Sequence, residues 1–286
     1  MNLLSGIEKF GFDTQKMDNL FEEEKKESSE VKENVSEERE VQETDFLLEK
    51  GVRCPICDKV FKTLMVKSGR LKRLEPDSDL RPRHQDIDSL KYDISSCPHC
   101  GYTAINRYFE HVTSVQRKLI QDGICSKFKP EDNVKEQEGI CAIDYDTALA
   151  RYKLSLFNTI VKKGANSEKA FTCLKISWLL RGMQETLPED ATEEKKTELQ
   201  KEEQAFYVQA FDGFFKAISS EMFPMCGMDQ TTVDYLLAAM AMRLHKYDVA
   251  AKLISGILTS PAAPSRIKNK ALNMKSDIIA AIHGAT

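Results

Sequence analysis

The sequence predicts a mainly α-helical protein that carries a small four-cysteine β ribbon. Two observations predict this fold class. The short couples "CPIC" and "CPHC" lie within residues 54–100, among short apolar runs that are typical of strands. From residue 144 onward, apolar residues recur at the helical period instead. We therefore expect an N-terminal ribbon followed by an array of helical hairpins.

Composition divides the 286-residue chain into four parts. A chain of this length can hold two or three modest cores. We expect an acidic tail over residues 1–49 and a ribbon with an enlarged insert over residues 50–115. A connecting helix end and loop should occupy residues 116–143, and a helical domain should occupy residues 144–286.

Acidic charge is concentrated at the start of the chain. Residues 1–50 contain fifteen acidic and seven basic residues, a net charge of −8, whereas the whole chain carries −4 and the remainder about +4. Residues 22–49 have few large apolar side chains and no Gly or Pro. Such a segment cannot bury enough apolar surface to offset the entropy lost on ordering. We predict a solvated tail, with a charged surface helix as the alternative.

The two cysteine couples are the strongest chemical signal. A C-x-x-C turn places two sulfurs on one side of a tight loop, and two such turns can complete a tetrahedron around one Zn²⁺ ion. A proline inside each couple restricts the turn, and Gly101 tolerates the positive φ with which a chain leaves it. We predict one structural zinc ion bound by Cys54, Cys57, Cys97 and Cys100. Four sulfur ligands would leave no open position for catalysis.

Other interpretations of the cysteines and histidines stay open. Two redox couples would also use C-x-x-C, although neither couple lies in a βαβ setting, and an iron centre is a third possibility. His84 and His99 could replace a thiolate, but we expect His99 to point outward and His84 to lie at the surface or in packing. Cys125 and Cys141 could be reactive thiols or a second metal pair, but we expect buried or incidental thiols.

The insert between the couples combines a strand pattern with basic charge. The mostly apolar run of residues 60–66, the turn signal Ser68–Gly69 and apolar Leu71 and Leu74 predict a β-hairpin. Basic side chains of this region could contact nucleic-acid phosphates. They are Lys62, Lys67, Arg70, Lys72, Arg73, Arg81 and Arg83. Acidic residues interleave, and residues 51–115 carry only about +3, so nucleic-acid binding is the alternative hypothesis.

Several phrases occur together in a specific combination. They are "CPICDKVFKTLMVKSGRLK", "DSDL", "DIDSLKYDISSCPHCGYTA", "CLKISWLLR" and "FPMCGMDQTTVDYLLAAMAMRL". With the helical half, this combination resembles the bacterial domain-of-unknown-function family 2225 over most of residues 51–283. The resemblance implies a zinc ribbon joined to tetratricopeptide-like helices. It also implies the four couple cysteines as metal ligands, and it carries over no established activity.

The second half of the chain predicts paired helices. Apolar residues at helical spacing predict helices over residues 144–163, 166–183 and 195–218. Residues 235–258 resemble one tetratricopeptide unit, in which small residues let two helices approach closely. One such unit cannot bury its apolar face alone, so we expect it to stack on the preceding helices. The array should bind a protein partner, with a purely scaffolding role as the alternative.

The sequence argues against several other classes of protein. It contains no Walker loop and no G-x-G-x-x-G, G-x-S-x-G or H-E-x-x-H motif, so we expect no catalytic residue. It has no run of eighteen apolar residues, and residues 1–13 lack the basic and continuous apolar regions of a secretory signal. We therefore expect a cytoplasmic, non-enzymatic zinc-binding protein.

Overall fold

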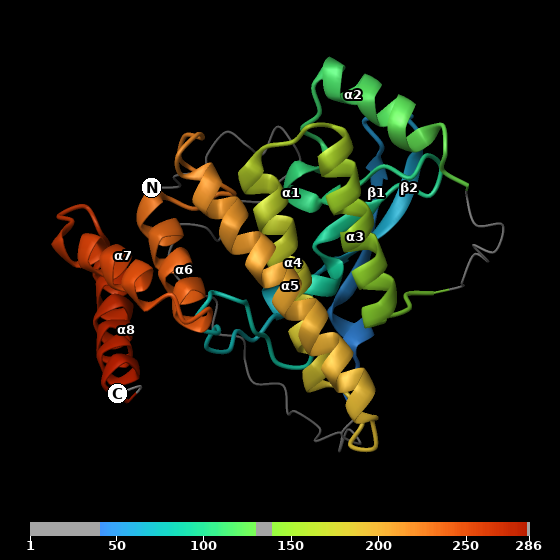
Figure 1. Cartoon of the computed structure of the whole chain (residues 1–286). Coiled ribbons are helices and arrows are strands. Elements are labelled where there is room, and N and C mark those ends of the chain that lie inside the picture. Colours follow the sequence, from blue (N-terminus) through green and yellow to red (C-terminus); the bar gives the residue numbers. More distant parts are fainter. Residues whose placement is uncertain (1–40, 130–138, 285–286) are drawn as a thin grey trace, which may run out of the picture. The chain divides into compact units, whose positions relative to one another are not determined.

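The computed structural model describes residues 41–129 and 139–284. From Val41 onward the chain forms one compact unit, which is mainly helical with two small antiparallel sheets (Figure 1). The predicted fold class is confirmed. Most of the predicted tail lies outside the described residues. Its last part does not remain solvated, because the 3₁₀ turn η2 (Glu43–Phe46) leads directly into the first strand, with Phe46 and Leu47 buried.

Two antiparallel hairpins form the ribbon. Strand β1 (Leu47–Arg53) pairs with β2 (Val60–Val66), and β3 (Ile94–Ser96) pairs with β4 (Thr103–Ile105). Residues 54–59 connect the first pair and residues 97–102 the second, so each connection contains one cysteine couple. The two couples are therefore the turns of the two hairpins.

The predicted hairpin between residues 60–66 and residues 71–74 is wrong. Strand β2 pairs with the preceding strand β1 instead, and the chain then makes the 3₁₀ turn η3 (Ser68–Arg70). The insert closes on itself through an isolated bridge between Arg73 and His84. The 3₁₀ turn η4 (Ser89–Tyr92) then leads into β3.

Short helices connect the ribbon to the helical array. Helix α1 (Asn106–Phe109) follows β4, and α2 (Ser114–Ile120) continues into the π-helical turn η5 (Gln121–Cys125). The side chain of Thr113 caps α2 by accepting a hydrogen bond from the Gln116 amide at 3.3 Å. The predicted connecting segment therefore contains a helix before the chain reaches the undescribed residues 130–138.

Within the described residues, six longer helices follow the ribbon; the sequence predicted the first five, whereas the sixth was not predicted as a separate helix. They are α3 (Tyr145–Val161), α4 (Asn166–Glu185), α5 (Glu193–Ala217), α6 (Gln230–Arg243), α7 (Tyr247–Thr259) and α8 (Ser265–Gly284). Asp144 and Asp229 cap α3 and α6 by accepting backbone hydrogen bonds at 2.6 and 2.7 Å. Neighbouring helices pack as α3–α4–α5 and α6–α7–α8 (Figure 1). None of the described helices is long and apolar enough to cross a lipid bilayer.

The largest core joins the ribbon to the helices. Leu90, Ile94 and Ile105, from η4, β3 and β4, belong to the same buried cluster as the inner faces of the helices. Helix α3 covers the β3–β4 hairpin. It also turns Asn158 inward, where its side-chain amide donates to the Gly101 carbonyl at 3.4 Å. Ile160, two residues further along the helix, lies on the solvent side and is 55 % exposed.

Candidate metal centre

The two cysteine loops share one backbone conformation. In each, the amide of the first cysteine donates to the carbonyl five residues later, at 2.9 Å in the first loop and 2.8 Å in the second. The amide four residues after that cysteine donates back to its carbonyl, at 3.0 Å in both loops. This returning residue has a φ of 61° at Asp58 and 75° at Gly101. The sequence predicted the left-handed position for Gly101 but not for Asp58.

The four couple sulfurs meet at one point. All four Sγ atoms lie within 4.8 Å of one another. The closest approaches are 3.6 Å between Cys54 and Cys100 and 3.7 Å between Cys57 and Cys97. Sulfurs bonded at about 2.3 Å to one tetrahedral ion lie about 3.8 Å apart. The sulfurs therefore fit one metal ion, and the closest contacts join different couples rather than pairing each couple as a redox disulfide would.

Crowding sets the protonation of the thiols. Hydrogen bonds with Cys100 and Cys54 lower the pKa of Cys97 to about 2. Contacts with Cys54 and Cys97, together with burial, raise the pKa of Cys100. Four thiolates this close together would repel one another, so all four can ionise only with a cation at the centre.

The cysteines pack against an apolar cluster of aromatic and aliphatic side chains. Phe61, Tyr102 and Phe109 are buried there, and the Tyr102 hydroxyl donates to the Phe109 carbonyl at 3.0 Å. The Phe128 side chain covers Gly101 so closely that a Cβ at that position would lie 2.4 Å from the ring. Glycine at 101 is thus required by close packing as well as by its φ.

The remaining histidines and cysteines lie outside the sulfur cluster. His99 is exposed, as predicted, and His84 Nδ1 hydrogen-bonds Ser89 Oγ at 3.1 Å. Cys125 is half-buried in the apolar cluster behind the sulfurs, whereas Cys141 is exposed. Across residues 41–129 and 139–284, no other group of three or more Cys, His, Asp or Glu side chains converges as a metal site would require.

A family model described as "Uncharacterized protein conserved in bacteria (DUF2225)" matches residues 47–278. The chain belongs to the DUF2225 family. The match begins at the first residue of β1 and includes both cysteine loops and helices α3 to α7. The resemblance seen in the sequence is confirmed. No curated protein and no solved structure matches the chain significantly.

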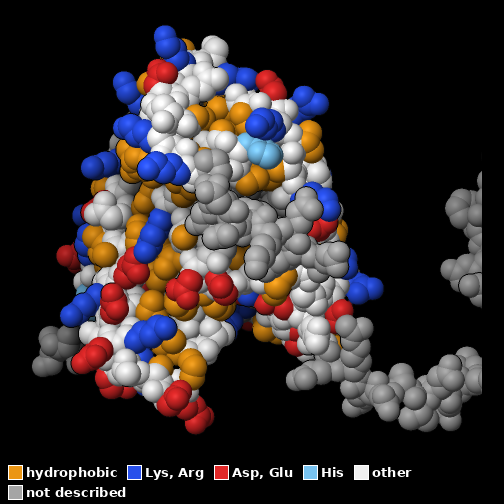
Figure 2. All heavy atoms as spheres, turned by 90° about the vertical axis from the view of Figure 1, so that its right-hand side faces the viewer, with side chains coloured by type: hydrophobic (Ala, Val, Ile, Leu, Met, Phe, Trp, Pro, Cys, Tyr) orange, Lys and Arg blue, Asp and Glu red, His pale blue; other side chains and the backbone are white. Residues whose placement is uncertain are grey.

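The basic residues of the insert have different environments in this DUF2225 protein. Lys62 pairs with Glu49 at 3.0 Å, and Lys67 and Arg70 donate to the Asp45 carbonyl at 3.1 and 3.3 Å. Lys72 and Arg73 are exposed. Figure 2 shows Lys and Arg side chains on the upper half of one face, at the height of α2, and more Asp and Glu side chains on its lower half.

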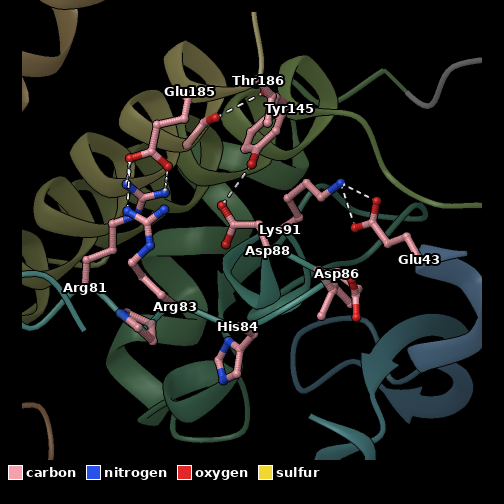
Figure 3. A pocket seen from close by; sticks show the side chains of 13 residues that line it. Glu43, Arg81, Arg83, His84, Asp86, Asp88, Lys91, Tyr145, Glu185 and Thr186 are labelled. Carbon is pink, nitrogen blue, oxygen red and sulfur yellow. Dashed lines mark hydrogen bonds and ion pairs between the residues drawn. The ribbon is translucent and has the colours of Figure 1, made fainter. Parts of the chain in front are cut away.

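Arg81 and Arg83 both form ion pairs with acidic residues. The Arg81 side chain is 5 % exposed and pairs with both Glu185 oxygens, at 2.8 and 2.9 Å (Figure 3). Arg83 Nη1 lies 3.2 Å from both Asp77 and Glu185. Binding of Arg81 to a phosphate would break a buried ion pair, which argues against Arg81 as a nucleic-acid contact.

Buried ion pairs connect the insert to three helices, and sequence reasoning missed them. Arg181 of α4 pairs with Asp79 of the insert at 2.8 Å and with Glu203 of α5 at 3.4 Å. Glu203 in turn pairs with Arg243 of α6 and accepts a hydrogen bond from Ser177 Oγ. The side chains of Asp79 and Glu203 are only 3 and 5 % exposed. An unpaired charge in such a buried position would lower the stability of the fold, so removing one partner of an ion pair should destabilise the protein.

The charge of Asp79 is maintained by Arg181. Burial alone would raise the pKa of Asp79, but hydrogen bonding and the charge of Arg181 hold it below its ordinary value. Asp79 therefore stays ionised at neutral pH. The stability that it contributes should be present above the pKa of an unfolded aspartate and should be lost as the pH falls through the lower, folded value.

Gly182 in α4 permits a close approach between the insert and the helix. A Cβ there would lie 2.7 Å from Asp88 Oδ2, 2.9 Å from Tyr145 Oη and 3.1 Å from Arg81 Nη2. We predict that Gly182→Ala lowers the free energy of unfolding by about 1–3 kcal/mol through overpacking. Denaturant titration measures this change.

The matched control is Gly256→Ala in α7, where an added Cβ would meet nothing within 4 Å. This variant should be neutral or stabilised by up to about 1 kcal/mol, because alanine has the higher helix propensity. Equal effects of the two substitutions would contradict the close approach at Gly182.

Proposed function

We propose that this protein is a non-enzymatic, zinc-stabilised module that binds another protein through its tetratricopeptide-like helical array. Zinc is supported by the four sulfur ligands at tetrahedral spacing, a donor set and geometry typical of closed structural zinc sites. In such a site the metal stabilises the two hairpin turns and offers no open coordination position. Binding function is therefore assigned to the helices.

The proposal rests on exposed aliphatic side chains of α8. Ala271, Met274 and Ile278 of this helix are buried in the core. Flanking this buried stripe, three large aliphatic side chains are 43 to 52 % exposed: Leu272, Ile279 and Ile282. Large aliphatic side chains that lie near one another on the exposed surface of a helix favour a partner that covers them.

Charge indicates the chemistry of that partner. Lys268 and Lys275 lie four residues before and three residues after Leu272, which places them on the same helical face. Lys275 is exposed and Lys268 half-buried. An amphipathic helix with aliphatic and acidic side chains would complement this surface in both respects.

The double variant Leu272→Gln, Ile279→Gln tests the proposal. We expect the melting temperature to stay nearly unchanged, because both side chains are about half exposed. A protein that the wild-type chain captures from the native cell should be purified and titrated by calorimetry against the wild type and against the variant. The affinity of the variant for this protein should be at least about tenfold lower than that of the wild type if the apolar face lies at the centre of the interface.

The control is Asn269→Ala, Asn273→Ala, which changes exposed residues of the same helix outside the apolar stripe. It should bind the captured protein as the wild type does. Unchanged affinity of the Leu272 and Ile279 variant would overturn the proposal. Capture of nucleic acid in place of protein would favour the alternative function, with Lys72 and Arg73 as its contacts.

A further inference from the structure

A polar pocket of about 390 Å³ lies between the insert and the helices. Its walls come from η2, from residues 81–91, from the start of α3 and from the end of α4. Figure 3 shows the Arg81 and Arg83 guanidinium groups on one side with Glu185, and the Lys91–Glu43 pair with Asp86 on the other. The volume lies within the usual range for small-molecule sites.

The arginine side chains of the pocket have hydrogen-bond donors that are not paired. Arg83 uses Nη1 for both of its ion pairs, and no described residue accepts a hydrogen bond from its Nε or Nη2. Arg81 Nε also has no partner but is fully buried, so the donors that a ligand can reach are those of Arg83, whose side chain is 39 % exposed. Unpaired donors in a concave site are the groups that recognise a carboxylate.

Two carboxylates of the pocket form no ion pair with a described residue. Asp88 accepts hydrogen bonds from the Leu90 amide at 3.0 Å and from the Tyr145 hydroxyl at 3.1 Å, which are neutral donors. Among the described residues, no Lys, Arg or His nitrogen lies within 4.0 Å of a carboxylate oxygen of Asp86 or Asp88. By contrast, Lys91 is already paired with Glu43 at 2.7 Å.

The side chains that line the pocket carry a net negative charge. The lining contains four carboxylates, at Glu43, Asp86, Asp88 and Glu185, against three cations, at Arg81, Arg83 and Lys91. Burial and the charge of Arg73 lower the pKa of His84, so this residue adds no charge at neutral pH. A ligand that brings an ammonium group to the acidic side and a carboxylate to the guanidinium side would satisfy both.

We propose that this pocket binds a small amino-acid zwitterion, with its ammonium group at Asp88 and Asp86 and its carboxylate at Arg83. A basic side chain on the ligand would also balance the excess carboxylate. The pocket uses none of the residues of the α8 face, so this site is independent of the proposed protein partner.

Calorimetry of the full chain tests the site with four probes. L-Lysine carries both groups, cadaverine lacks the carboxylate, glutarate lacks the ammonium, and L-glutamate carries the opposite side-chain charge. We expect L-lysine to bind, and cadaverine and glutarate to bind at least about tenfold more weakly, because each leaves one side of the pocket unpaired. L-Glutamate should bind more weakly than L-lysine.

Two variants locate the site. Asp88→Asn keeps a side-chain oxygen that can accept from the Leu90 amide, and Arg83→Gln keeps a hydrogen-bond donor at a partly exposed position. Both should weaken L-lysine binding at least about tenfold, whereas exposed Asp248→Asn should not. The proposal is overturned if L-lysine does not bind at millimolar concentration, if cadaverine binds equally well, or if both site variants bind L-lysine like the wild type. A variant that fails to fold leaves the wild-type probe series to decide.

Discussion

Cys57→Ser should remove the metal and unfold the ribbon. Structural zinc contributes about 10–16 kcal/mol to the folding of small zinc domains, which is as large as the whole stability of a typical protein. Serine at position 57 leaves three sulfur ligands. We expect elemental analysis to find about one zinc ion per wild-type chain and far less in the variant. Hydrogen exchange should accelerate throughout β1, β2, β3 and β4.

Cys57 is a suitable position because it is the most accessible of the four ligands, so serine there disturbs little packing. The control is Cys141→Ser, which changes an exposed thiol outside the sulfur cluster and should keep both metal and stability. A strong chelator added to the wild type should reproduce the Cys57→Ser result. A metal-free wild type with the stability of the metal-loaded protein would contradict a structural metal.

Glu203→Gln should be the most damaging conservative change in the helical array. Glutamine keeps the shape of glutamate but removes the charge shared by Arg181 and Arg243. Breaking a buried ion pair from one side costs about 3–5 kcal/mol because the remaining charge is left uncompensated. Arg243 is partly exposed and can recover some hydration, so we expect the lower end of this range. Thermal melts should show a fall of roughly 10 °C.

A second Glu→Gln change on the same helix provides the control. Glu193 is 85 % exposed and pairs with Lys196 across one helical turn, an arrangement that contributes little to stability. Glu193→Gln should therefore melt with the wild type. If Glu203→Gln melts with it as well, the ion pairs do not stabilise the junction between insert and helices.

The helices and the sulfur cluster could be predicted because their signals are local. A helix needs only apolar residues at a fixed period and a cap such as Asp144, and a metal knuckle needs only two cysteines in one tight turn. Strand β1 had no comparable signal. Only Leu47 among its residues is buried, so the alternation that identifies a half-buried strand is absent, and β2 was assigned to the wrong partner.

The ion pairs and the polar pocket could not be predicted for a different reason. Asp77, Asp79 and Arg81 place charges of both signs close together in the insert, which is also typical of a solvated surface segment. Their partners Arg181 and Glu185 lie more than a hundred residues later. The close approach at Gly182 could not be predicted either, because a lone glycine in a helix does not reveal which side chains pack against it.

The separation between these partners also has a consequence for synthesis of the chain. Each cysteine hairpin closes over a short connection, so both hairpins can form and bring the four sulfurs together as soon as residues up to Ile105 have emerged from the ribosome. Arg81 meets Glu185 only 104 residues after itself. During that interval the insert is held at both ends by the cysteine hairpins, whereas the helices that carry the partners of its charged side chains have not yet been synthesised.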